Sequence, residues 1–221
     1  MTSDPDSAAN PYQTPVPEAA PLAQVLKNPR GFALASCWLL AVATLAGVAV
    51  HLAEILVPYE IINDVESLPF IGYTLAALAW LVAYFAAVTL FLFWKYRAAA
   101  NARILDPLAI SVSPGLAVGG YFIPFANLYI PYRAMSGIAR ASFGASILPG
   151  LWWTLHLVNS FVSFGVLGEQ LDTVEILPPG DLAHVGTVCD IIAATVSIYL
   201  VMKITRAQSA RLPRSSGSSS K

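Results

Sequence analysis

The chain has 221 residues, of which 57% are apolar and 11% charged, and its mean hydropathy is +0.65. An ordinary soluble domain carries about a quarter charged residues, so the composition predicts an integral membrane protein, with room for four or five spans at about 20 apolar residues each. The net charge is -1 and the chain has no Lys/Arg-rich run, so nucleic acid is not an expected partner.

The chain opens with a polar segment, residues 1–30, that is rich in Pro, Ala, Ser, Asp and Asn. It has no periodic apolar pattern, which predicts a disordered tail. Lys27 and Arg30 come directly before the first long apolar run, whereas a secretory signal would begin with its basic residues. We therefore expect the first apolar run to be a retained anchor.

Four apolar runs predict transmembrane helices. Their bounds are 31–57, 70–94, 147–167 and 182–202. The second run ends in "FWKYR", an aromatic and basic collar typical of a membrane interface. The last residues, 207–221, are polar and predict a second disordered tail, so that the membrane domain would cover residues 31–206.

The charges of the connections predict the orientation of these spans. The connections 59–69 and 168–181 carry acidic residues but no Lys or Arg. Every Lys and Arg lies instead on the N-terminal flank, in the central connection or on the C-terminal flank. Because positive charge collects on the cytoplasmic side, we expect an all-α protein of the bacterial inner membrane with both termini in the cytoplasm.

The central connection contains "GGYFIPFANLYIPYR", which is apolar enough to enter a membrane. If it crossed, Arg133 and Arg140 would face outward, against the rule just used. Pro124 and Pro131 also interrupt any helix there. We therefore expect a re-entrant or interfacial segment at 113–142 between the second and third spans, ending in a short basic amphipathic helix. The sequence leaves open whether this segment dips into the membrane or lies on its surface.

The stretch from Trp94 to Ser142, together with "LWW" at 151–153, resembles a family of bacterial membrane proteins known as domain of unknown function 4328. The matching positions are Trp94, Arg97, Asn101, Ala102, Pro114, Gly119, Phe122, Pro124, Asn127, Leu128, Pro131, Ser142, Trp152 and Trp153. Gly120 departs from the family pattern, which usually has an aromatic residue there. The resemblance implies a polytopic membrane protein and no particular reaction.

The same stretch has a physical interpretation of its own. Gly115 and Gly119 form a G-x-x-x-G spacing, which predicts close approach of a neighbouring helix. Asn127 and Asn101 are expected to hydrogen-bond carbonyls that the broken helix leaves unpaired. In the alternative interpretation, these amides and the broken backbone bind an ion or a substrate, as unwound segments do in transporters.

Ionisable residues inside membrane spans are costly and therefore mark candidate sites. His156 on the third span and Asp190 on the fourth are predicted at similar depths in the outer half of the membrane. Asn159 lies one turn from His156, and His51 and Glu54 lie one turn apart on the first span. Whether His156 and Asp190 meet is open at this stage.

Such a polar cluster has three interpretations. A carboxylate beside an imidazole can relay a proton or a cation, or it can simply hold two helices together by a hydrogen bond. A metal site made of His51, Glu54, His156 and Asp190 would require all four to converge, and no tight ligand spacing supports it. We expect neither a metal nor another cofactor, and we expect His184 to be a solvated residue at the outer flank.

No common enzyme motif is present, so an enzyme is the third of three function classes. The leading hypothesis is a structural or interaction protein whose basic cytoplasmic face contacts anionic lipid or a protein partner, with a homo-oligomer as an open alternative. That face consists of Lys95, Arg97, Arg103, Arg133, Arg140, Lys203 and Arg206. The second hypothesis is a small transporter or ion-coupled carrier that uses His156 and Asp190. Cys37 and Cys189 are expected to remain unpaired.

Overall fold

A computed structural model describes residues 26–62, 64–171 and 181–212, and these ranges contain helices and no strand. The elements are α2 (Arg30–Leu56), α3 (Tyr59–Ile62), α4 (Leu68–Leu105), α5 (Pro114–Gly119), the 3₁₀ turn η2 (Ala126–Leu128), α6 (Ile130–Phe143), α7 (Leu148–Leu171) and α8 (Asp181–Ser209).

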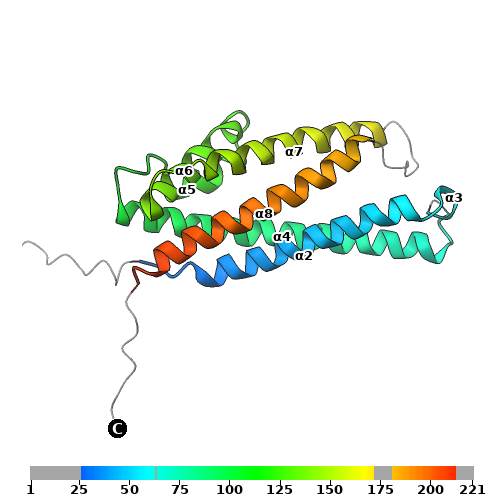
Figure 1. Ribbon diagram of the computed structural model, residues 1–221, viewed down its shortest axis with the longest axis horizontal. Helices are drawn as coiled ribbons and strands as arrows, with labels where there is room; N and C mark the ends of the chain where they lie inside the picture. Colours follow the sequence, from blue (N-terminus) through cyan, green and yellow to red (C-terminus); the bar gives the residue numbers. More distant parts are fainter. Residues whose placement is uncertain (1–25, 63, 172–180, 213–221) are drawn as a thin grey trace, which may run out of the picture.

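The four long helices α2, α4, α7 and α8 form an elongated bundle in which consecutive helices run in opposite directions (Figure 1). The main packed pairs are α2 with α4, α7 with α8, and α2 with α8. The short helix α3 lies at one end of the bundle, which we call the α3 end. At the opposite end, the α6 end, α5 and α6 gather around the C-terminal part of α4 and the last turns of α8.

Large apolar side chains cover the outside of the bundle. Trp38 is 72% exposed, Leu45 70% and Phe164 72%. Contiguous apolar surface of this kind is rare on soluble monomers. Within the described part of the chain, three helices are long and apolar enough to cross a membrane, namely α2, α4 and α8 from Ala183 onward. This is compatible with a multi-pass membrane protein.

The expected fourth span corresponds to α7, whose 24 residues reach about 36 Å at 1.5 Å per residue. This length exceeds the roughly 30 Å hydrocarbon core of a bilayer. However, α7 is not among the three helices that satisfy both length and hydropathy. Four spans therefore remain a prediction. The antiparallel packing of α7 against α8 is consistent with this prediction.

The second long helix extends well past the expected bound of 94. Ser67 accepts a hydrogen bond from the Phe70 amide at its start, and α4 then continues without a break to Leu105, giving 38 residues or about 57 Å. The added residues include Ala98, Ala99 and Ala102, which are strong helix formers and are completely buried. This extension packs against protein at the α6 end.

Lys95, at the start of the extension, is completely buried. Its Nζ donates to the Tyr121 hydroxyl at 2.7 Å and to the Pro131 carbonyl at 3.3 Å. The same atom lies 4.4 Å from the ring centre of Tyr121 and 5.2 Å from that of Trp152. Aromatic faces and a carbonyl thus stabilise the ammonium. The expectation that Lys95 belongs to the exposed basic face is wrong.

The central segment starts and ends against α4, since α5 and α6 both pack on that helix. Ser113 caps α5 by accepting from the Leu116 amide, and Trp153 Nε1 of α7 donates to the Leu128 carbonyl at 2.8 Å. At the tip of the segment, Phe125 has a φ of 61°, which a non-glycine residue rarely adopts, and its side chain is 87% exposed. The expected amphipathic helix is present as α6, which buries Met135 and Ile138 against the bundle.

The glycines of this segment behave differently from the sequence expectation. A Cβ added at Gly115 or Gly119 would meet nothing within 4 Å, so the G-x-x-x-G spacing does not mark a close helix approach. A Cβ at Gly120 would lie 2.5 Å from Ile130 Cγ2 and 2.9 Å from the Leu116 carbonyl oxygen. The tight contact is one residue further along, at the position where this chain departs from the family pattern.

Candidate functional site

The five polar residues singled out inside the predicted spans line one cavity of about 340 Å³. His51 and Glu54 come from α2, His156 and Asn159 from α7, and Asp190 from α8. The cavity lies within the long-helix bundle, and α4 completes its wall with aromatic side chains. Their shared location agrees with the predicted cluster, while the role of these residues remains a prediction.

The hydrogen bonds inside this cavity differ from the expected ones. Asn159 Nδ2 donates to Asp190 Oδ1 at 2.6 Å. His156 Nδ1 instead contacts the Trp152 carbonyl of its own helix at 2.9 Å. His156 and Asp190 thus face the same cavity without a hydrogen bond between them, and the His156–Asp190 pair that the carrier hypothesis used is not formed. Asn159 lies three residues after His156, about one helical turn further along α7, and it is Asn159 that reaches Asp190 on α8.

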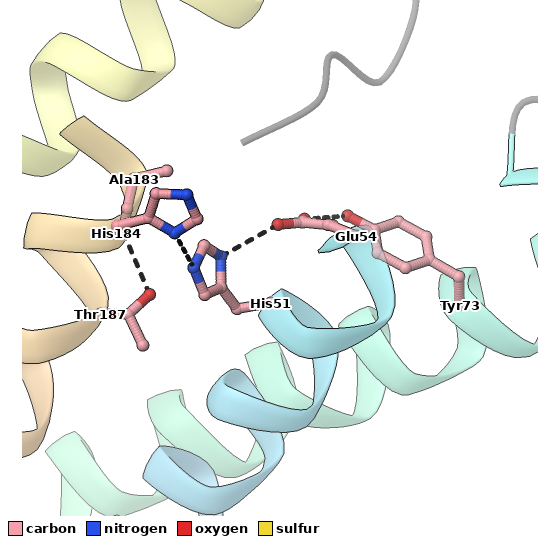
Figure 2. Close-up of polar contacts among 6 residues, drawn as sticks. All are labelled: His51, Glu54, Tyr73, Ala183, His184 and Thr187. Carbon is pink, nitrogen blue, oxygen red and sulfur yellow. Dashed lines mark hydrogen bonds and ion pairs between the residues drawn. The ribbon is translucent and has the colours of Figure 1, made fainter. Parts of the chain in front are cut away.

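A second polar chain connects α2, α4 and α8 near the α3 end (Figure 2). Tyr73 of α4 donates its hydroxyl proton to Glu54 Oε1 at 2.6 Å, and Glu54 Oε2 lies 3.3 Å from His51 Nδ1. His51 Nε2 lies 3.0 Å from His184 Nδ1. His184 is exposed but bonded, so the expectation of a purely solvated flank residue was incomplete.

With Glu54 taken as ionised and His51 as neutral, one arrangement of protons satisfies every contact in this chain. An ionised Glu54 only accepts hydrogen bonds, so Nδ1 of His51 carries a proton. In a neutral His51, Nε2 is then an acceptor and receives the Nδ1 proton of His184. Glu54 therefore has both oxygens engaged, one with Tyr73 and one with His51.

The proposed four-residue metal set does not converge as a coordination site. Among the described residues, no three His, Cys, Asp or Glu side chains are arranged to hold a metal ion. Cys37 and Cys189 are both free thiols, as expected from their predicted depths. The geometry thus provides hydrogen-bonding groups around a cavity, without a set of metal ligands.

The family-pattern residues lie at the α6 end, where Asn101 is the centre of a buried amide network. Asn101 Nδ2 donates to the Lys27 carbonyl at 2.7 Å and to Gln208 Oε1 at 3.1 Å, and its Oδ1 accepts from the Lys27 amide at 2.9 Å. Gln208 Nε2 donates to the Ala98 carbonyl and to Ser142 Oγ. Lys27 and Gln208 lie inside the expected tails, 1–30 and 207–221, yet both are integrated into this end.

The other polar and proline residues of the pattern have mainly structural contacts. Pro114 opens α5 and Pro131 lies in the first turn of α6. Arg97 donates to the Asn28 carbonyl and stacks on Phe32 with 4.5 Å from its Cζ to the ring centre. Pro124 precedes the strained Phe125 and its carbonyl accepts from the Ala126 amide.

Asn127 does not take the role expected of it. Its Nδ2, the group that could donate to a free carbonyl, makes no hydrogen bond among the described residues, and its Oδ1 is buried there without a partner. The carbonyl of the neighbouring Leu128 is satisfied by Trp153 instead. Asn101 likewise bonds the Lys27 backbone and not the interrupted segment. The contacts of the motif thus hold the α6 end together, and binding of an ion or a substrate by this segment remains an untested prediction.

Sequence reasoning missed several residues that matter in these two regions. Tyr73 gives no distinctive signal in the sequence, because tyrosine is common near the ends of membrane helices, and Gln208 gives none because it lies in a polar stretch. His184 carried a usable signal, since four consecutive antiparallel helices bring the start of α8 to the same end of the bundle as the end of α2. Trp80 and Tyr84, which line the cavity from α4, could not be distinguished from other apolar positions of that run.

The model of one protein family, Domain of unknown function (DUF4328), matches residues 71–206 of the chain. This match extends from the first half of α4 to the last turns of α8 and includes both the cavity residues on α4, α7 and α8 and the Asn101 region. No curated protein and no solved structure matches the chain.

Proposed function

The chain belongs to the DUF4328 family of domains of unknown function, and on that premise we propose that it is a four-span protein of the bacterial cell membrane whose α6 end binds anionic lipid at the cytoplasmic face. In this proposal it serves as a structural or interaction component of the membrane. The observation that carries it is the position of exposed arginines around exposed aromatic side chains at one end of the bundle.

The cationic groups of that end are available for headgroups. Arg103 ends α4, Arg133 and Arg140 lie on α6, and Arg206 lies near the end of α8, and all four side chains are exposed. An ionised residue near an anionic surface contributes about 1 kcal/mol of attraction. Several such residues on a single face favour recruitment of anionic lipid.

The aromatic groups of the same end support an interfacial position for the central segment. Phe122 is 73% exposed and Phe125 87% exposed. Tyr129 is 55% exposed and lies beside Arg133, whose Cζ is 5.9 Å from its ring centre. Aromatic side chains next to cations are typical of the level of the lipid headgroups. We therefore propose that residues 113–142 lie on the membrane surface with Phe122 and Phe125 inserted.

The topology is tested by cysteine labelling in a variant without Cys37 and Cys189. Leu108→Cys and Ile147→Cys flank the central segment at side chains that are 96% and 84% exposed. We expect both to react with a membrane-impermeant maleimide only after the cells are opened. Val65→Cys, in the acidic connection before α4, is the positive control and is expected to react in intact cells. Reaction of Ile147→Cys in intact cells would mean that the central segment crosses the membrane.

Lipid binding is tested by changing Arg133, Arg140 and Arg206 together to glutamine. After extraction from membranes that contain phosphatidylglycerol and phosphatidylcholine, we expect the variant to retain less than about a tenth of the phosphatidylglycerol bound by the wild type. Three attractions of about 1 kcal/mol each are lost, and a total of about 3 kcal/mol weakens binding more than a hundredfold. Mass spectrometry of the co-purified lipid gives the measurement.

The matched control replaces the same three arginines with lysine, which keeps the charge. This variant is expected to retain most of the bound phosphatidylglycerol, because attraction to an anionic surface depends mainly on charge. Equal lipid binding by the glutamine variant and the wild type would remove the basis of the proposed function, whereas loss in both variants would indicate a requirement for arginine geometry.

A further inference from the structure

The cavity between the long helices has a chemistry that the lipid-binding proposal does not use. At about 340 Å³ it falls at the lower end of the roughly 300–1,000 Å³ range of small-molecule sites. Its wall includes the carboxylates of Glu54 and Asp190 and the aromatic rings of Tyr73, Trp80 and Tyr84. No Lys or Arg is among the residues that line it.

The unpaired polar atoms of this cavity are acceptors. Asn159 donates its Nδ2 to Asp190, which fixes the orientation of the amide because a carboxylate only accepts. Asn159 Oδ1 is consequently buried with no hydrogen-bond partner among the described residues. Asp190 is exposed and uses Oδ1 for Asn159, and among the described residues its Oδ2 has no hydrogen-bond donor. A buried acceptor without a donor, such as Asn159 Oδ1, is costly, so the site is complementary to a group that donates hydrogen bonds.

The negative charge of the cavity and the aromatic side chains of its wall restrict the chemical class of the ligand further. Asp190 is a carboxylate on an apolar helix, and the cavity lining holds no Lys or Arg, its basic side chains being His51 and His156. A carboxylate within a membrane span is costly unless a cation is present. Trp80 and Tyr84 also line the cavity, and aromatic ring faces attract organic cations. A metal ion fits less well, because among the described residues no three ligating side chains converge.

We propose that this cavity binds a small organic ammonium, held by Asp190 and Asn159 and by the faces of Trp80 and Tyr84. Glu54 adds negative charge, although its two oxygens are already engaged by Tyr73 and His51. The cavity lies closer to the α3 end of the bundle than the buried Asn101 network does. None of the arginines of the α6 end lines the cavity. Amine binding is thus independent of lipid binding.

The test is isothermal titration calorimetry of the purified full-length protein in lipid nanodiscs with choline as the probe. The trimethylammonium group of choline supplies the positive charge, and its hydroxyl group supplies the hydrogen-bond donor, because a quaternary nitrogen has no N–H. The uncharged carbon isostere of choline, 3,3-dimethylbutan-1-ol, has the same shape without the charge. We expect saturable binding of choline and at least tenfold weaker binding of the alcohol, a difference of about 1.4 kcal/mol. Equal binding of the two compounds, or no binding of choline, would overturn the proposal without any variant being needed.

Asp190→Asn identifies the anchoring group, because it removes the charge at nearly constant size. We expect the Kd for choline to rise about tenfold or more, which corresponds to about 1.4 kcal/mol. Glu60→Gln is the matched control, since Glu60 is an exposed carboxylate on α3 at the same end of the bundle and outside the cavity. An unchanged Kd in a folded Asp190→Asn protein, or an equal loss in Glu60→Gln, would contradict the assignment.

Discussion

Replacing Asn101 with leucine is expected to lower the thermal unfolding temperature of the detergent-solubilised protein by about 10 °C. Asn101 is 1% exposed and makes three hydrogen bonds, two to the Lys27 backbone and one to Gln208. Leucine has a similar size but no polar atom, so it leaves Gln208 unpaired in a buried site and two groups of the Lys27 backbone unpaired in a partly buried one. Each unpaired partner costs about 1–3 kcal/mol of stability. With each cost near the lower limit, the three unpaired partners together cost about 3–4 kcal/mol.

The control for this variant is Asn28→Leu, which makes the same chemical change one residue after Lys27. Asn28 is exposed, and its side chain accepts one hydrogen bond, from the Arg30 amide. Water can replace that partner, so the unfolding temperature is expected to fall by no more than about 2 °C. A drop of similar size in both variants would mean that the buried network does not hold the N-terminal segment against α4 and α8.

Gly120→Ala is expected to destabilise the protein by about 2 kcal/mol, or about 6 °C in unfolding temperature. The new Cβ would lie 2.5 Å from Ile130 Cγ2, 2.9 Å from Ile130 Cβ and 2.9 Å from the Leu116 carbonyl oxygen. The backbone of Gly120 is helical, with φ at −60°, so conformational strain plays no part. The cost comes from pushing α6 away from the end of α5, and differential scanning fluorimetry measures it.

The neighbouring glycine provides a matched control in the same turn of chain. A Cβ at Gly119 would meet nothing within 4 Å, and alanine is the better helix former by about 1 kcal/mol. Gly119→Ala is therefore expected to leave the unfolding temperature unchanged or to raise it slightly. If the two alanine variants have the same stability, the contact between Gly120 and Ile130 is not the close packing described above.

Hydropathy predicted the positions of the four long helices but not their full lengths. The second helix is expected to end at residue 94 because its continuous apolar run ends there, whereas α4 continues to Leu105. The continuation "KYRAAANARIL" is helical because its alanines are buried against protein and its polar groups find partners there. A hydropathy scan finds the part of a helix that is apolar enough to contact lipid. It does not find helix ends that are stabilised by tertiary packing.

The cavity could be predicted as a set of residues but not as a set of bonds. Charged and amide side chains in apolar runs are conspicuous, so His51, Glu54, His156, Asn159 and Asp190 were identifiable from sequence. Which of them pair depends on the rotation of each helix about its axis, and a difference of one turn selects Asn159 over His156 as the partner of Asp190. Single-sequence patterns carry no information about that rotation beyond the apolar face, and here every face is apolar.

The uninterrupted length of α4 has a mechanical consequence. Tyr73 reaches Glu54 at the cavity, and Asn101 holds the backbone of Lys27 at the far end of the same helix. The 28 residues between them (101 − 73) correspond to about 42 Å, more than the thickness of the hydrocarbon core. A continuous helix of this length is stiff, so a tilt imposed on one end is transmitted to the other. In the proposed membrane arrangement, α4 would therefore couple the two sides of the bilayer mechanically.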